Sequence, residues 1–199
     1  MEFILNWDSS FFLAINGLAD QAPWFDSIMV FLTNANTWRI AGGVLAIAIL
    51  IWGDNPLRRT VIAATLALVI ADITAFNLLK PLFYRPRPGN ILLDVTILAP
   101  AASYCGFPSN HAANMMALAI TFTLRQHKPW SFILIPVALV VGFSRIWVGV
   151  HFPLDVLGGW LWGVLVGWLG AVAVTLLEKK FGWGQPPHVA WCPKQCQRK

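Results

Sequence analysis

The strongest constraint on this chain is a series of long apolar stretches separated by short polar loops. A helix needs about 20 mostly apolar residues to cross the hydrocarbon core of a bilayer. Five stretches approach or reach that length: residues 38–52, 60–79, 112–124, 131–150 and 154–177. The sequence therefore predicts an all-α, polytopic membrane helix bundle with five to six transmembrane helices.

The N-terminal region is the least regular part of this pattern. Two apolar segments, FFLAINGLA and PWFDSIMVFL, are separated by the polar sequence DQAP, so one of them is expected to lie at the membrane interface. We predict three regions: an N-terminal interfacial or first-helix region (1–37), a membrane core (38–178) and a basic cytoplasmic tail (179–199).

Composition argues against several other classes of protein. Charged residues make up 12% of the chain, against about 25% in soluble domains, which leaves too little polar surface for a water-soluble body. The net charge of +5 does not indicate nucleic-acid binding, because the cations lie between apolar segments. Three cysteines are too few for a disulfide framework. In the tail, the spacing of His188, Cys192 and Cys196 suits a metal site, with an ordinary basic tail as the simpler interpretation.

The loops on the two sides of the predicted bundle differ in charge. One side carries nine Lys and Arg residues, and the positive-inside rule places it in the cytoplasm. The outer side carries five, namely Arg39, Lys80, Arg85, Arg87 and Arg145. Anchoring cations are not expected on that side, which favours a binding role for them.

Three polar clusters are predicted to meet at the outer face. The first, KPLFYRPRP at residues 80–88, follows a membrane helix and holds three cations. The second, GFPSNHAAN at residues 106–114, opens a helix with Ser109 as its N-cap, which places His111 at a helix N-terminus suited to anions. A simple capped helix start is the alternative for this second cluster.

The third cluster, SRIWVGVHFPLD at residues 144–155, pairs a histidine with an acid. His151 and Asp155 are four residues apart, so a helix that begins near Phe152 lets the carboxylate reach the imidazole. A carboxylate on one ring nitrogen makes the other nitrogen a better nucleophile. The alternative is a purely structural Asp–His bond.

Together these clusters predict phosphoryl transfer through phosphohistidine. Cations in this number imply an anion with several oxygens, one histidine has an acid partner, and the second is free to act as a general acid. Asp94 and Asp155 are expected to be the only acids near this face, so we predict no metal site and no cofactor there.

The spacing of these residues resembles the type 2 phosphatidic acid phosphatase superfamily of membrane lipid phosphatases. Its signature is K-x6-RP, then PSGH, then SR-x5-H-x3-D, and the chain reproduces it between Lys80 and Asp155, with Asn110 in place of the glycine. The asparagine keeps the backbone N–H that the family is thought to offer to phosphate, so the departure bears on substrate fit.

The resemblance implies a role for each matching residue. His151 is the nucleophile, Asp155 is its partner and His111 protonates the leaving group. The expected phosphate ligands are Lys80, Arg87, Ser109, Asn110 and Arg145, and the candidate substrate contacts are Arg85 and Ser144. For Arg85, contact with a second phosphate or head group and snorkelling to the interface are both open.

The resemblance also implies the substrate class. It favours hydrolysis of undecaprenyl pyrophosphate, with broad tolerance of lipid phosphates, in a bacterial inner membrane. The loop charges place the site on the extracytoplasmic side, and the mostly apolar loop 89–107 is expected to lie over it. Phosphatidylglycerophosphate phosphatase, lipid A phosphatase and lipid-to-lipid phosphotransferase are the alternatives. The expected partners are lipid phosphates and membrane lipids, with no nucleic acid.

Two further patterns concern the helices themselves. Asp72, Thr74 and Asn77 add polarity to the stretch 60–79, which we attribute to hydrogen bonds between helices or to support of the outer end. An anion transporter, which also needs polar groups within the membrane, is the remote alternative. Glycines at 159, 163 and 167 recur every four residues and predict close helix packing.

Overall fold

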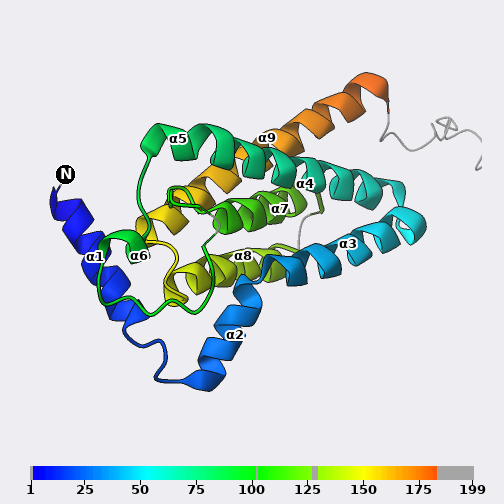
Figure 1. The fold of residues 1–199 in the computed structure, drawn as a ribbon. Helices are drawn as coiled ribbons and strands as arrows, with labels where there is room; N and C mark the ends of the chain where they lie inside the picture. Colours follow the sequence, from blue (N-terminus) through cyan, green and yellow to red (C-terminus); the bar gives the residue numbers. More distant parts are fainter. Residues whose placement is uncertain (1, 102, 127–129, 183–199) are drawn as a thin grey trace, which may run out of the picture.

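The structure is a computed structural model that describes residues 2–101, 103–126 and 130–182 (Figure 1). Within these residues the regular structure is helical and no strand is present, apart from an isolated bridge between Pro86 and Cys105. The helices are α1 (Glu2–Asn16), α2 (Pro23–Thr33), α3 (Ala35–Trp52), α4 (Asn55–Thr74), the π-helical turn η1 (Ala75–Leu79), α5 (Lys80–Phe83), α6 (Pro88–Ile91), α7 (Asn110–Gln126), α8 (Trp130–Trp147) and α9 (Pro153–Phe181). The predicted all-α class is confirmed.

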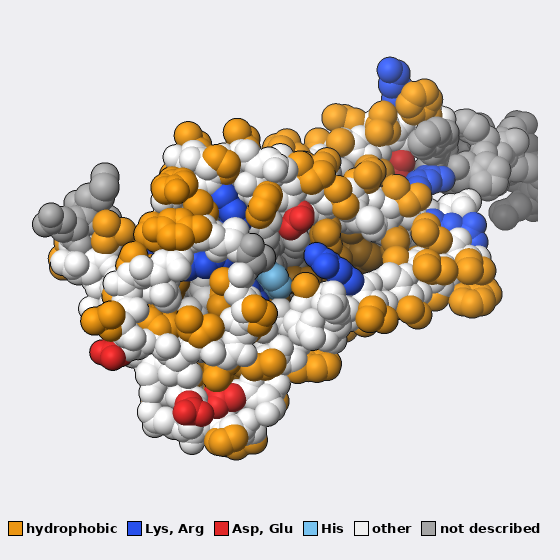
Figure 2. All heavy atoms as spheres, in the orientation of Figure 1, with side chains coloured by type: hydrophobic (Ala, Val, Ile, Leu, Met, Phe, Trp, Pro, Cys, Tyr) orange, Lys and Arg blue, Asp and Glu red, His pale blue; other side chains and the backbone are white. Residues whose placement is uncertain are grey.

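Four helical segments are long and apolar enough to cross a membrane: Ala35–Trp52, Asn55–Phe83, Trp130–Trp147 and Pro153–Phe181. They match four of the five predicted stretches, and α7, with 17 residues, occupies the position of the fifth. Hydrophobic side chains cover much of the visible surface (Figure 2), and none of the α3 residues is buried in the protein. A bundle that exposes this much apolar surface suits lipid rather than water.

Helix α7 lies at the centre of the bundle and packs against α4, α8 and α9 (Figure 1). Small residues allow this close approach, since a methyl group added to Gly159 of α9 would lie 2.5 Å from the Ser109 carbonyl oxygen. One added to Gly167 would lie 2.6 Å from the Ala117 carbonyl oxygen. The close packing predicted from the glycine spacing is therefore confirmed, and it fixes the start of α7 beside the start of α9.

The N-terminal region forms two separate helices rather than one long one. Helix α2 packs on α8, and α1 lies across the end of the bundle (Figure 1). On α1, the residues buried in the protein include Asp8, Phe12 and Asn16, one every four residues, so a single face of α1 points inward. This face carries an acid and an amide, which explains why the stretch did not look like a membrane span.

The predicted separation of the cations is visible at the two ends of the bundle. At one end, Arg59 and Arg125 contact Glu178 at 3.5 Å and 2.7 Å. At the other end lie Lys80, Arg85, Arg87 and Arg145, described below. His188, Cys192 and Cys196 lie outside the described residues.

The polar side chains of α4 and η1 behave mostly as predicted. Asp72 accepts hydrogen bonds from Asn110 at 2.9 Å and Asn114 at 2.8 Å, both on α7. Thr74 accepts a bond from the indole of Trp162 on α9 at 3.0 Å. Asn77 instead donates to the Ile73 carbonyl within its own segment, at 3.1 Å, and so does not link two helices.

Candidate active site

The loop between α8 and α9 presents His151 at the end of the bundle. Gly149 adopts a left-handed conformation (φ 83°), which glycine reaches without steric cost, and lets the chain turn sharply after α8. The amides of Val150 and His151 then both donate to the Arg145 carbonyl at 3.2 Å. His151 is 2% exposed, so its imidazole is buried in the protein.

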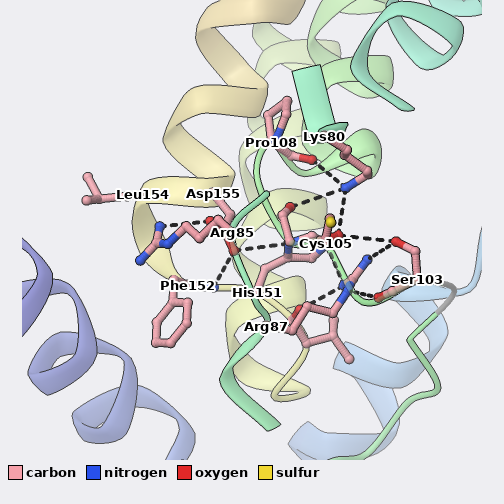
Figure 3. A network of polar contacts seen from close by, with 12 residues as sticks. Lys80, Arg85, Arg87, Ser103, Cys105, Pro108, His151, Phe152, Leu154 and Asp155 are labelled. Atoms are coloured by element: carbon pink, nitrogen blue, oxygen red, sulfur yellow. Dashed lines mark hydrogen bonds and ion pairs between the residues drawn. The ribbon is translucent and has the colours of Figure 1, made fainter. Parts of the chain in front are cut away.

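His151 lies between Asp155 and Arg87 (Figure 3). The Arg87 Nη1 is 3.0 Å from Nε2 of the imidazole, and Asp155 Oδ2 is 3.4 Å from Nδ1. A guanidinium only donates hydrogen bonds, so Nε2 must be the acceptor and carries no hydrogen. The proton of the neutral ring therefore lies on Nδ1 and faces the carboxylate, which leaves Nε2 unprotonated on the opposite side of the ring.

The charge state of His151 follows from its surroundings. Burial holds the pKa of the imidazole well below its ordinary value, and the positive charges of Arg87, Arg145 and Lys80 lower it further. The ring is therefore neutral, with an unprotonated Nε2, at and somewhat below neutral pH.

Asp155 is fixed by the start of α9. Its Oδ2 accepts a hydrogen bond from the Phe152 amide at 3.0 Å, which caps the helix. The carboxylate is fully buried. The predicted approach of Asp155 to the imidazole thus arises because the helix begins at Pro153, within one residue of the expected start.

Arg87 and Lys80 tie the site to the segment that precedes α7. Besides His151, Arg87 donates to the carbonyls of Ser103 at 2.6 Å and Val150 at 2.8 Å. The Lys80 ammonium donates to the carbonyls of Cys105, Gly106 and Pro108 at 3.2, 3.3 and 2.9 Å (Figure 3). Both side chains are almost fully buried, which is costly for cations without an anion.

Two buried polar atoms near His151 have no hydrogen-bond partner among the described residues. They are the hydroxyl oxygen of Ser109 and the Nε of Arg145. Ser109 directly precedes α7, and its carbonyl accepts from the Ala113 amide at 3.0 Å, so it stands at the predicted N-cap position. Unsatisfied buried groups of this kind are rare and point to a ligand.

A cleft of about 430 Å³ opens beside Arg87. It is lined by Arg87, Gly89, Asn90, Ile97, Ala101, Ser103, Tyr104, Gly149 and Val150. Most of these residues belong to the loop 89–107, which was predicted to lie over the site. The cleft therefore borders the guanidinium that contacts His151.

Comparison with known proteins places this arrangement in a family. The PAP2 superfamily model matches residues 59–179, more than half of the chain. The chain belongs to the PAP2 superfamily. The family predicted from the three motifs is thereby confirmed, together with the predicted enzyme class, a phosphatase.

Individual PAP2 proteins show how far the similarity extends. The chain is 35% identical over 159 residues to the undecaprenyl-diphosphatase BcrC of Bacillus subtilis, covering 79% of each protein. It is 30% identical over 176 residues to the lipid A 4′-phosphatase of Porphyromonas gingivalis, covering 84% of this chain and 72% of that protein. Its fold is similar, with a TM-score of 0.69 and 22% identity, to a transmembrane PAP2-type phosphatidylglycerolphosphate phosphatase from Bacillus subtilis, covering 90% of this chain and 88% of that one.

Asn110, which departs from the PAP2 pattern, directs its side chain to Asp72 of α4. Its amide donates to the carbonyl and to a carboxylate oxygen of Asp72, at 3.2 and 2.9 Å. His111 follows it in α7 and lies within electrostatic reach of Asp72, Arg145 and Arg39. His111, the second histidine of the predicted site, thus has an acid nearby. In Figure 2, a histidine, an acid and basic side chains gather on one otherwise hydrophobic face.

The two residues predicted to contact the substrate, Ser144 and Arg85, bind other groups of the protein. The Ser144 hydroxyl donates to the Val141 carbonyl of the same helix at 2.7 Å. Arg85 donates to Asp155 Oδ1 at 2.8 Å and forms a second ion pair with Asp8. Both side chains therefore bind groups within the protein, and the Arg85 side chain is 17% exposed.

One prediction about this end of the bundle was wrong. Asp94 and Asp155 are not the only acids there, because Asp8 and Asp72 also contact residues of the three motifs. Asp8 comes from α1, outside the part of the chain that carries the PAP2 motifs. The four-residue spacing of Asp8, Phe12 and Asn16, which places all three on one face of a helix, was the sequence signal that could have revealed this acid.

Proposed function

We propose that this PAP2 protein hydrolyses the phosphate of a membrane lipid through a phosphohistidine formed on His151. The position of His151 carries the proposal, because Asp155 holds the Nδ1 proton and leaves Nε2 unprotonated, as a nucleophile must be. Its neutral state near physiological pH keeps that nucleophile available. The preferred substrate is undecaprenyl diphosphate, as in the relative named for it.

The phosphate would lie among Arg87, Arg145, Lys80 and the start of α7. Arg145 Nε and the Ser109 hydroxyl are buried without partners, and phosphate oxygens would supply the bonds that they lack. The Asn110 backbone N–H lies in the first turn of α7, where the helix dipole favours an anion. Lys80 contributes charge while it holds the segment that leads into α7.

The reaction then takes two displacements. His151 Nε2 attacks phosphorus, the bond from phosphorus to the leaving oxygen breaks, and His111 gives that oxygen a proton. Arg87 leaves Nε2 and binds the phosphoryl oxygens. Water next attacks the phosphohistidine, His111 takes the water proton, and inorganic phosphate departs with Nε2 restored. His111 enters the first step protonated and regains that proton from the attacking water in the second.

The same proposal includes topology. We infer five transmembrane segments, formed by α3, α4 to α5, α7, α8 and α9, with α1 and α2 as the interfacial N-terminal region. The nine-cation side, which includes Arg59 and Arg125, faces the cytoplasm, and the basic tail follows it there. The site then faces the extracytoplasmic side of a bacterial inner membrane, where lipid phosphates diffuse laterally to it.

We expect a phosphate-release panel to rank undecaprenyl diphosphate first. The panel compares it with phosphatidylglycerophosphate, phosphatidic acid and lipid A by kcat/KM in detergent micelles. The expected advantage is at least about tenfold, since discrimination between lipids of similar charge depends on a few apolar and polar contacts. A higher kcat/KM for another lipid would reassign the substrate, and release from none of the four would refute the proposed function.

Chelation is expected to leave the activity unchanged. Cations of the protein, rather than a metal ion, neutralise the phosphate in this mechanism. Treatment with EDTA followed by assay in metal-free buffer should change kcat by less than about twofold. Loss of activity that is restored by Mg²⁺ but not by dialysis alone would contradict the mechanism.

A further inference from the structure

The catalytic carboxylate uses both of its oxygens, and only one of them serves His151. Asp155 Oδ2 faces the imidazole and the Phe152 amide, whereas Oδ1 accepts from Arg85 Nη1 at 2.8 Å (Figure 3). Arg85 therefore binds the oxygen of Asp155 that does not face His151. Because the carboxylate is rigid, holding Oδ1 in place also fixes the direction of Oδ2.

Arg85 is itself held from the N-terminal helix. Its Nη2 forms an ion pair with Asp8 of α1, and the other oxygen of Asp8 accepts from the Leu154 amide at 2.9 Å. Asp8 thus binds both the arginine and the first turn of the helix that carries Asp155. Asp8 and Asp155 are fully buried, so these bonds are shielded from water.

Aromatic packing fixes the same arrangement. The Arg85 guanidinium lies 4.6 Å from the centre of the Phe152 ring, and Phe12 of α1 meets that ring edge-on at 5.3 Å. Phe152 directly follows His151 in the loop. Asp8 and Phe12 are one helical turn apart, so a single face of α1 supports the arginine, the carboxylate and the loop that carries the nucleophile.

We propose that Arg85 and Asp8 are positioning residues that hold Asp155 in line with His151, so that α1 is part of the catalytic apparatus. This inference rests on the proposed role of His151 as nucleophile. Two buried carboxylates that share one guanidinium keep a defined geometry only while all three members are present. Arg85 then acts on the reaction through Asp155 and does not bind the substrate.

The test is a double-mutant cycle on kcat and KM with undecaprenyl diphosphate. Arg85→Ala and Asp8→Asn are each introduced into the wild-type protein and into Asp155→Asn. In the wild type we expect kcat to fall about 10–100-fold, the usual effect of removing the outer partner of a catalytic group, with KM nearly unchanged.

In Asp155→Asn the same changes should cause no further loss, because the group through which they act is already inactive. Arg85→Lys keeps the positive charge but not the planar guanidinium that binds two carboxylates, so its kcat should lie between those of Arg85→Ala and the wild type.

Several results would overturn the inference. A higher KM at unchanged kcat would make Arg85 a substrate contact. An equal loss in the Asp155→Asn background would show a structural role that is independent of the carboxylate. Arg125→Ala is the matched control, since it breaks a comparable, partly buried arginine–acid pair at the far end of the bundle. If it lowers kcat as much, the effect of Arg85 is general destabilisation.

The variants also separate this inference from the proposed function. Asp8→Asn keeps the size of the side chain and an acceptor for the Leu154 amide, so it remains interpretable if Arg85→Ala does not fold. Elution of each variant as a single species in detergent checks folding. A wild-type protein that releases no phosphate contradicts the proposed function, whereas an active wild type with unaffected Asp8→Asn and Arg85→Ala contradicts only the positioning role.

Discussion

We expect His151→Ala to lower phosphate release from undecaprenyl diphosphate by at least about a thousandfold, since loss of the nucleophile removes the covalent route entirely. The ring also contacts both Arg87 and Asp155. The measurement is single-turnover release of inorganic phosphate by the purified protein, which avoids any contribution from slow product release.

His151→Gln is the control for folding in this experiment. Glutamine fills part of the space and can hydrogen-bond to Arg87 and Asp155, but it forms no phosphoramidate intermediate under turnover. We expect it to match the wild type in detergent stability and to match His151→Ala in activity. A normal rate in either variant would remove His151 from the role of nucleophile.

The second large effect is expected for His111→Ala, and it should depend on the leaving group. A lipid phosphomonoester such as phosphatidic acid must expel a strongly basic alkoxide, so loss of the general acid should lower its hydrolysis by about 10²–10⁴-fold. Undecaprenyl diphosphate expels a weakly basic phosphate, and its hydrolysis should fall much less. The measurement is kcat for both substrates with the same preparation.

His151→Ala provides the comparison for this prediction. It should reduce hydrolysis of the two substrates to a similar degree, because both need the nucleophile. His111→Gln should resemble His111→Ala, since glutamine cannot deliver a proton. An equal loss for both leaving groups in the His111 variants would assign His111 to phosphate binding instead of proton transfer.

The sequence predicted the membrane core well because a single physical requirement dominates it. Apolar length alone identifies α3, α4, α8 and α9, and the four-residue spacing of Gly159, Gly163 and Gly167 identifies the face of α9 that approaches α7. The two short N-terminal segments could be told apart but not placed relative to the membrane, since α1 buries Asp8 and Asn16 beside Phe12 and so lacks a continuous apolar face.

The site was predictable where its contacts are local. His151 and Asp155 are four residues apart, so the start of α9 alone determines their approach. The Arg85–Asp8 pair joins residues 77 positions apart, and the Asn110–Asp72 bond joins residues 38 positions apart. Such distant contacts are set by how α1 and α4 pack, and no local pattern specifies them. For Arg85 in particular, the sequence showed a cation near a phosphate site but not the two acids that hold it.

The most direct test of the central claim is to trap the phosphorylated protein. Undecaprenyl diphosphate carrying ³²P in its terminal phosphate is mixed with the protein, and the reaction is stopped with base within one turnover. The account predicts a label that survives base, is lost in acid as a phosphoramidate is, and maps to the peptide that contains His151. Turnover without any bound label at all sampled times, or label on His111, would contradict it.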